Sequence, residues 1–158
     1  MADPPTRKAL LVDALGTTVR LPPPWERLDR ALTAGLEPDR VREAFEAEMS
    51  HYAAHAHEAR DADSLASLRR DCAAILSEGL GRDVGVEPMI AAIAFEAYPD
   101  APGTLAELRS RGLAIVCVSN WDYELEAVLE RVGLLRYMRG VVASALAGAR
   151  KPDPAIFE

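Results

Sequence analysis

The stretch ALLVDALGTT (residues 9–18) joins a short apolar block to a carboxylate and a Gly-Thr turn. Four consecutive apolar residues that end at a polar turn predict a buried strand of a parallel sheet. Asp13 would then lie at the carboxyl end of that strand, where open parallel sheets bind their ligands. Gly16 allows the backbone to turn sharply there. Taken alone, the stretch is equally consistent with an aspartate that only caps a turn.

Two further apolar blocks end in the same way. Residues 113–118 (LAIVCV) stop at Ser119-Asn120, and a weaker block covers residues 141–143. An apolar face at helical spacing in residues 125–132 separates the two blocks, and a helix between successive strands implies a right-handed crossover and a parallel sheet. The sequence therefore predicts an α/β, Rossmann-like core in which three strands are present.

The long segment between the first two strands is predicted to be helical throughout. Apolar side chains recur there at spacings of three and four, typical of helices with one buried face. One such stripe consists of Val41, Phe45, Met49 and Tyr52. The expected organisation is a core formed by residues 1–18 and 98–158 and an all-helical insertion at 19–97.

Composition limits the possible functions. The chain has 158 residues, of which 49% are hydrophobic and 27% charged, and its net charge is −7. This is a globular composition, and the acidic balance disfavours nucleic acid as a partner. No stretch approaches the ~20 apolar residues that a membrane span needs. Cys72 and Cys117 lie in apolar runs and are predicted to be buried free thiols in a reducing compartment, so a cytoplasmic protein is expected.

Lys151 belongs to a third polar cluster, at residues 150–154. It is one of only two lysines in an arginine-rich chain, the other being Lys8. An ammonium is a compact point charge that can sit between a carboxylate and an anionic substrate, unlike a guanidinium fork. The simpler interpretation is a solvated loop lysine, just as Ser119-Asn120 alone is typical of a turn or helix start.

The order and spacing of the three clusters are more specific. With residues 11–17, 115–120 and 148–154 as its first three motifs, the chain resembles the haloacid dehalogenase superfamily of hydrolases. The helical insertion after the first motif is similar to that family's cap domain. The resemblance covers essentially the whole chain and rests on three motifs in the family's order.

The resemblance implies roles for individual residues. Asp13 would be the nucleophile that forms a covalent aspartyl intermediate. Lys151 would offset negative charge at Asp13 and the substrate. Ser119, Asn120 and Thr17 would bind a small anionic substrate. In the phosphatases of the family Mg²⁺ is held by the nucleophile, here Asp13, by the backbone carbonyl of Leu15 and by an acid of a fourth motif.

Leu15 departs from the phosphatase pattern, in which a second aspartate at that position acts as general acid. The leading hypothesis is a metal-assisted hydrolase of small phosphorylated metabolites. Since halide leaves without a proton, a metal-independent 2-haloacid dehalogenase is the alternative within the family, although Trp121 replaces the glycine usual there. A non-catalytic binding module is the alternative of another class.

The fourth motif is absent as well. Asp153-Pro154 is typical of a helix start, yet the chain stops at Glu158. These features predict a truncated copy or fragment of a longer hydrolase, with weak affinity for Mg²⁺. The strand that carries Asp13 would then be an exposed apolar edge, through which the chain could self-associate.

The histidines of the insertion offer another metal site. His51 and His55 share one helix face and could bind zinc together with Glu48 or Glu58, although a solvated face is the simpler interpretation. Tyr52 could line a cleft between the insertion and the core or only pack within the insertion. Trp121 could form a wall of the active site or only pack against the helix that follows it.

Overall fold

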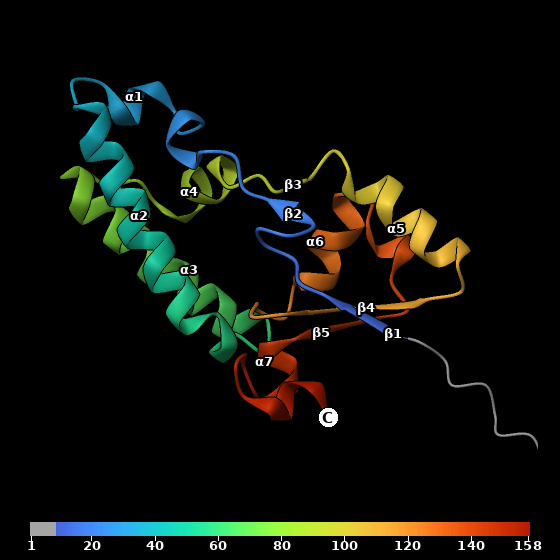
Figure 1. Ribbon diagram of the computed structural model, residues 1–158. Coiled ribbons are helices and arrows are strands. Elements are labelled where there is room, and N and C mark those ends of the chain that lie inside the picture. Colours follow the sequence, from blue (N-terminus) through green and yellow to red (C-terminus); the bar gives the residue numbers. More distant parts are fainter. Residues whose placement is uncertain (1–8) are drawn as a thin grey trace, which may run out of the picture.

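The computed structural model describes residues 9–158, and its centre is a parallel sheet of three strands in this part of the chain. The strands are β1 (Ala9–Val12), β4 (Ala114–Ser119) and β5 (Gly140–Ala143), in the order β1-β4-β5. Leu10 is in register with Ile115, and Cys117 with Val141. The α/β class and the parallel sheet are as predicted, and Figure 1 shows the helices around the sheet.

One face of the sheet is covered by α5 (Ala101–Ser110) and α6 (Leu125–Arg131). The same part of the fold also contains η3 (Leu135–Tyr137), α7 (Ser144–Ala147) and η4 (Pro154–Phe157). Leu105 of α5 and Leu129 of α6 share one buried cluster with Ile115 and Cys117 of β4. Since alternate residues of a strand point to opposite faces, α5 and α6 bury the same face of β4.

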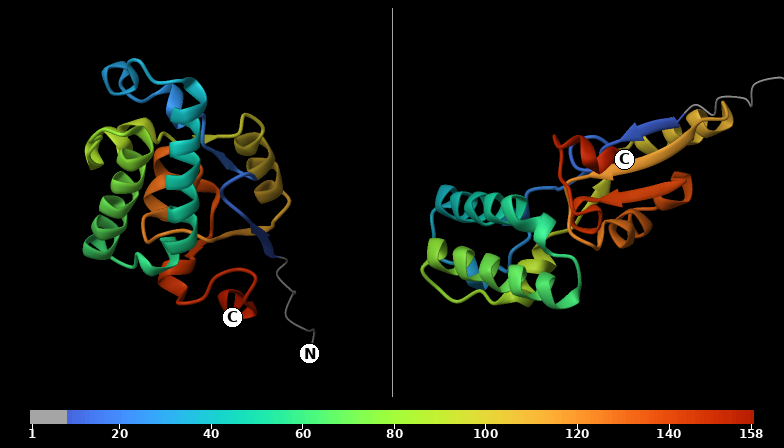
Figure 2. Two further views of the ribbon diagram at one scale, coloured as in Figure 1. Left: turned by 90° about the vertical axis from the view of Figure 1, so that its left-hand side faces the viewer. Right: turned by 90° about the horizontal axis from the view of Figure 1, so that it is seen from below.

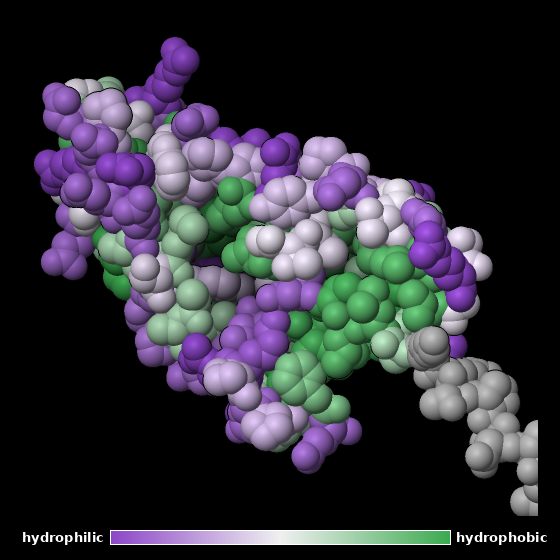
Figure 3. Space-filling model, viewed as in Figure 1, coloured by the Kyte–Doolittle hydropathy of each residue, from purple (hydrophilic) through white to green (hydrophobic). Residues whose placement is uncertain are grey.

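The opposite face is partly open. Leu11 is 50% exposed, and its register partner Val116 is only partly buried. Figure 3 shows hydrophobic surface gathered over β1. Sheets of this kind normally have both faces covered, because their strands are apolar on both sides.

A helical layer lies beyond the carboxyl ends of the strands (Figures 1 and 2). It contains η1 (Pro24–Glu26), α1 (Arg30–Thr33), α2 (Pro38–His55), η2 (Ala56–Glu58), α3 (Ala62–Leu80) and α4 (Val86–Ala92), called the cap below. The long helices α2 and α3 pack together around a second buried cluster, which includes Phe45, Leu65 and Leu76.

Residues 19–97 are not helical throughout. β2 (Val19–Arg20) and β3 (Glu96–Ala97) pair antiparallel at the base of the cap, where the chain leaves and re-enters the core. Their pairing is reinforced by an ion pair of 2.7 Å between Arg20 and Glu96. Two residues are too few to show the alternation by which strands are recognised in a sequence. The two strands lie at the first and the last residues of the segment 19–97 expected to form the insertion.

The buried face of α2 differs by one position from the predicted stripe. Glu48 is only 2% exposed, whereas Met49 is half-buried. One oxygen of Glu48 is buried without a hydrogen-bond partner among the described residues. Burial raises the pKa of Glu48, and a contact with the Cys72 thiol only partly opposes this shift. A hydrophobic pattern cannot reveal a buried carboxyl, because charged side chains are rarely buried.

Replacement of Glu48 by Gln is expected to stabilise the fold at neutral pH by about 1 kcal/mol, because a neutral amide costs less to bury than a carboxylate. A raised pKa in the folded state means that folding favours the protonated acid. The wild type therefore loses stability relative to the variant as the pH rises above the ordinary carboxyl range. Urea unfolding at several pH values measures this difference.

Glu46→Gln is the matched control, since Glu46 lies exposed on the same helix. The control should leave the free energy of unfolding nearly unchanged. A Glu48→Gln protein that is less stable than the wild type at neutral pH would show that the carboxylate is stabilising where it lies.

Both cysteines are buried and free, as predicted. Burial and the negative charge of nearby Asp13 raise the pKa of the Cys117 thiol to about 12. This thiol is therefore protonated and unreactive at neutral pH. Within residues 9–158, no helix has the length and the apolar character that spanning a membrane requires.

Candidate active site

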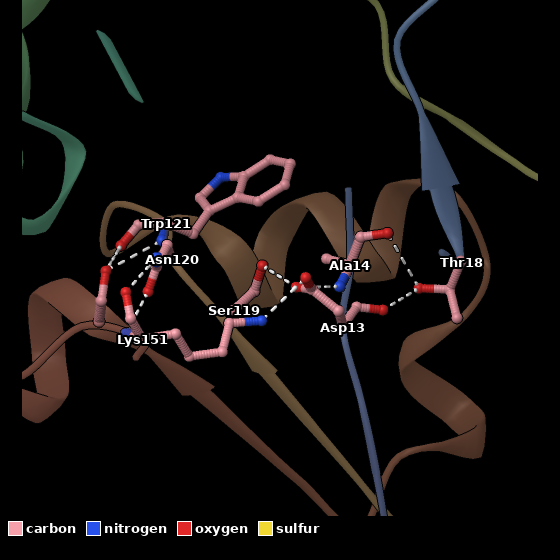
Figure 4. A network of polar contacts seen from close by, with 8 residues as sticks. Asp13, Ala14, Thr18, Ser119, Asn120, Trp121 and Lys151 are labelled. Atoms are coloured by element: carbon pink, nitrogen blue, oxygen red, sulfur yellow. Dashed lines mark hydrogen bonds and ion pairs between the residues drawn. The ribbon is translucent and has the colours of Figure 1, made fainter. Parts of the chain in front are cut away.

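Asp13 follows β1 directly and forms the centre of a polar network (Figure 4). Its Oδ1 accepts hydrogen bonds from the Ser119 hydroxyl at 2.7 Å and from the backbone N–H of Ala14 at 2.8 Å. The ammonium of Lys151 lies 2.8 Å from Oδ2. The structure thus brings together three side chains that are far apart in the sequence.

The strand pairing explains why Asp13 and Ser119 meet. Val12 is in register with Cys117 of the neighbouring parallel strand, so β1 and β4 end at the same edge of the sheet. The turn after Asp13 is held by hydrogen bonds from the backbone N–H of Gly16 to the carbonyl of Val19 and from the N–H of Val19 to the carbonyl of Ala14, both of 2.8 Å. Gly16 has a φ of 80°, which glycine adopts without strain.

Asn120 holds the loop that carries Lys151. Its side-chain oxygen accepts a hydrogen bond of 2.7 Å from the backbone N–H of Lys151, and its side-chain nitrogen donates to the Lys151 carbonyl at 3.1 Å. The resemblance to the family implies a role for Asn120 in substrate binding. In the structure its amide is already bonded at both ends to the Lys151 backbone.

The charge of Asp13 is stabilised by its neighbours. Partial burial raises the pKa of this carboxyl, but the Lys151 ammonium and the hydrogen bonds from Ser119 and Ala14 lower it by more, so the pKa lies below its ordinary value. Asp13 is therefore ionised at neutral pH and can act as a nucleophile or bind a cation.

Thr17 is not part of this network. Its side chain is exposed in the turn, and its backbone N–H donates to the carbonyl of Ala14 at 3.2 Å. The next residue, Thr18, is buried instead, and its hydroxyl donates to the Asp13 carbonyl at 2.9 Å. Nothing in the sequence distinguishes these adjacent threonines, since the geometry of the turn decides which hydroxyl is buried against the Asp13 backbone.

The described residues offer little to a metal ion. No group of three or more His, Cys, Asp or Glu side chains within residues 9–158 could hold one. The rings of His51 and His55 lie tilted with centroids 4.5 Å apart, and Glu58 lies 3.5 Å from Nδ1 of His55. Glu48 is buried in the cap, and neither glutamate completes a zinc set with the two histidines among the described residues. Mg²⁺ is commonly bound through one or two carboxylates together with substrate phosphate. Asp13 supplies one such carboxylate, and the backbone carbonyl of Leu15 could supply a further oxygen ligand.

The model of the family described as haloacid dehalogenase-like hydrolase matches residues 8–158. The chain belongs to this family. A bovine relative, "Haloacid dehalogenase-like hydrolase domain-containing protein 3", is 49% identical over 57 residues, which are 36% of this chain and 23% of the relative. The chain thus aligns with about a quarter of the length of this curated relative.

Solved structures of the family share the fold. An L-2-haloacid dehalogenase from Xanthobacter autotrophicus superposes with a TM-score of 0.65 at 23% identity, covering 96% of this chain and 62% of that one. A HAD phosphatase from Thermococcus onnurineus is 26% identical, with a TM-score of 0.54 and coverage of 95% and 68%. Both phosphatases and dehalogenases occur among the neighbours, so the comparison leaves the substrate class of this chain unresolved.

Proposed function

We propose that this hydrolase acts on small phosphorylated metabolites through an aspartyl-phosphate intermediate on Asp13. The observation that supports the proposal is the position of the Asp13 carboxylate between the Ser119 hydroxyl and the Lys151 ammonium, at 2.7 and 2.8 Å. A carboxylate that is ionised, partly exposed and paired with a cation is suited to attack an electrophilic phosphorus.

In the proposed reaction one Asp13 oxygen forms a bond to phosphorus, and the bond to the leaving oxygen breaks with its electron pair. Lys151 offsets the charge that builds up between carboxylate and phosphate, and Ser119 can turn its hydroxyl to a phosphate oxygen. Water then cleaves the aspartyl phosphate, which frees phosphate and restores Asp13. When bound through Asp13 and the Leu15 carbonyl, Mg²⁺ would add shielding between these negative charges.

Leu15 leads to the sharpest test. Its side chain is apolar and 49% exposed, two residues after the nucleophile, and it cannot protonate a leaving oxygen. General acid catalysis is worth about 10²–10⁴-fold, so esters whose leaving groups need a proton should be poor substrates. We expect hydrolysis of aryl and acyl phosphates with Mg²⁺ present and much slower hydrolysis of alkyl phosphates. No turnover of any phosphate ester by the folded chain would contradict the proposal.

A carbon–halide hydrolase is the second candidate, favoured by the same residue. Halide departs without a proton, so the lack of a general acid at Leu15 would not slow this reaction. Asp13 would form a carboxylic ester in place of an aspartyl phosphate. Release of halide from 2-haloacids in the presence of a chelator would select this function over the first.

We further propose that the open face and edge of β1 permit self-association between copies of the chain. Leu11 is half exposed on this strand, and unpaired apolar strands tend to pair with other chains. Leu11→Lys is expected to shift the protein toward monomer in sedimentation experiments, whereas Ala47→Lys at an exposed position of α2 should not. A wild type that is monomeric at every tested concentration would contradict this proposal.

A further inference from the structure

Segment 119–124, which follows the end of β4, contacts both the reacting pair and the cap. At its first end lie Ser119, which donates to Asp13, and Asn120, whose amide makes two hydrogen bonds to the backbone of Lys151. The segment therefore fixes both partners of the ion pair between Asp13 and Lys151.

The middle of the segment is anchored in the core. The backbone N–H of Trp121 donates to the Ser144 hydroxyl at 3.0 Å, and this hydroxyl donates back to the Trp121 carbonyl at 3.1 Å. The Trp121 ring is buried, and its centroid lies 4.9 Å from that of Phe95. Figure 4 draws the indole ring above the Asp13 network, and Trp121 belongs to the buried cluster of the core.

The other end of the segment is bonded to the cap. The Tyr52 hydroxyl of α2 donates to Asp122 at 2.7 Å, and the backbone N–H of Tyr123 donates to the carbonyl of Ala59 at 3.0 Å. An ion pair of 2.7 Å joins Glu124 to Arg69 of α3.

Asp122 makes this connection sensitive to the position of the cap. It is only 3% exposed, and its two oxygens accept from the Tyr52 hydroxyl and from the backbone N–H of Glu124. A buried carboxylate that loses one of its donors is costly, so displacement of Tyr52 from Asp122 would require the surrounding chain to rearrange.

We infer that cap docking positions Lys151 against Asp13 through segment 119–124. Tyr52 acts at the cap end, and Asn120 is the positioning residue at the active-site end. The inference rests on the proposed role of Asp13 and Lys151 as the reacting pair. It assigns to Asn120 the placement of a catalytic group and not the binding of substrate.

Hydrogen exchange of the Lys151 amide tests this coupling without any substrate. The amide donates to Asn120, and Lys8→Arg leaves Lys151 as the only lysine, so lysine-selective ¹⁵N labelling gives one lysine backbone signal. In this background Asn120→Ala is expected to accelerate exchange roughly fivefold to tenfold, because the exchanging amide loses its acceptor. Tyr52→Phe removes only the hydroxyl that binds Asp122. Because this contact acts on Lys151 only through segment 119–124, we expect a smaller acceleration of exchange, about threefold.

Tyr137→Phe is the matched control, because Tyr137 packs in the core cluster away from the cap, and it should leave the exchange rate unchanged. If the folded Tyr52→Phe protein exchanges at the control rate, cap docking does not reach Lys151 and the inference is overturned. Unchanged exchange in Asn120→Ala would overturn it equally. These rates do not depend on turnover, so the absence of any substrate would disprove the proposed function and leave the coupling measurable.

Where turnover is found, a kinetic comparison separates positioning from substrate binding. Tyr52→Phe should lower kcat and leave KM nearly unchanged, because a displaced Lys151 weakens the chemical step more than the initial binding. A rise in KM at constant kcat would assign Tyr52 to substrate binding and contradict the inference.

Discussion

Asp13→Asn is expected to abolish turnover, with a loss of at least about 10⁴-fold in kcat. The amide has nearly the shape of the carboxylate, but its oxygen is a poor nucleophile and carries no charge to pair with Lys151. Because Asp13 is partly exposed and its turn is held by backbone hydrogen bonds, the variant should remain folded.

Asp71→Asn is the matched control for this variant. Asp71 lies exposed on α3, so the same chemical change there should leave turnover and the unfolding temperature nearly unchanged. Turnover by Asp13→Asn at a rate near that of the wild type would exclude Asp13 as the nucleophile.

Lys151→Met should have the second-largest effect, a loss of about 10²–10³-fold in kcat. Methionine keeps most of the aliphatic side chain and removes the ammonium that lies 2.8 Å from Asp13. Since Lys151 lowers the pKa of Asp13, its removal should raise that pKa, and the acid limb of the kcat/KM profile should move to higher pH.

Lys151→Arg separates charge from geometry. A guanidinium keeps the positive charge but is planar and larger, so we expect only partial recovery of kcat together with an acid limb close to that of the wild type. If Lys151→Met retained the kcat and the acid limb of the wild type, the ammonium would have no part in the reaction.

The sequence was sufficient to predict the sheet because its strands are short apolar blocks with polar ends. β1, β4 and β5 lie where such blocks occur, and parallel pairing places the residues that follow them at one edge. The contact between Asp13 and Ser119 follows from this rule. Lys151 could be assigned to the same edge only through the family resemblance, since a loop lysine has no pattern of its own.

The rest depends on tertiary contacts that leave no local signal. Glu48 occupies a core position of α2 that hydrophobic periodicity assigned to Met49. In the sequence, Asn120 is consistent with substrate binding or with a turn. Only the tertiary structure shows that its amide is hydrogen-bonded to the Lys151 backbone. Tyr52 could have lined a cleft, but its contact with Asp122 joins the cap to the core.

The central claim is that Asp13 becomes covalently bonded to substrate, and chemical trapping tests it most directly. Borohydride added during turnover reduces an aspartyl phosphate or an aspartyl ester to homoserine, which mass spectrometry can locate. Asp13 is the only acid in the tryptic peptide of residues 9–20, so the assignment there is unambiguous. We expect homoserine at position 13 in the wild type and none in Lys151→Met treated for the same time. Substrate turnover with an unmodified peptide, or with homoserine at another position, would contradict the account.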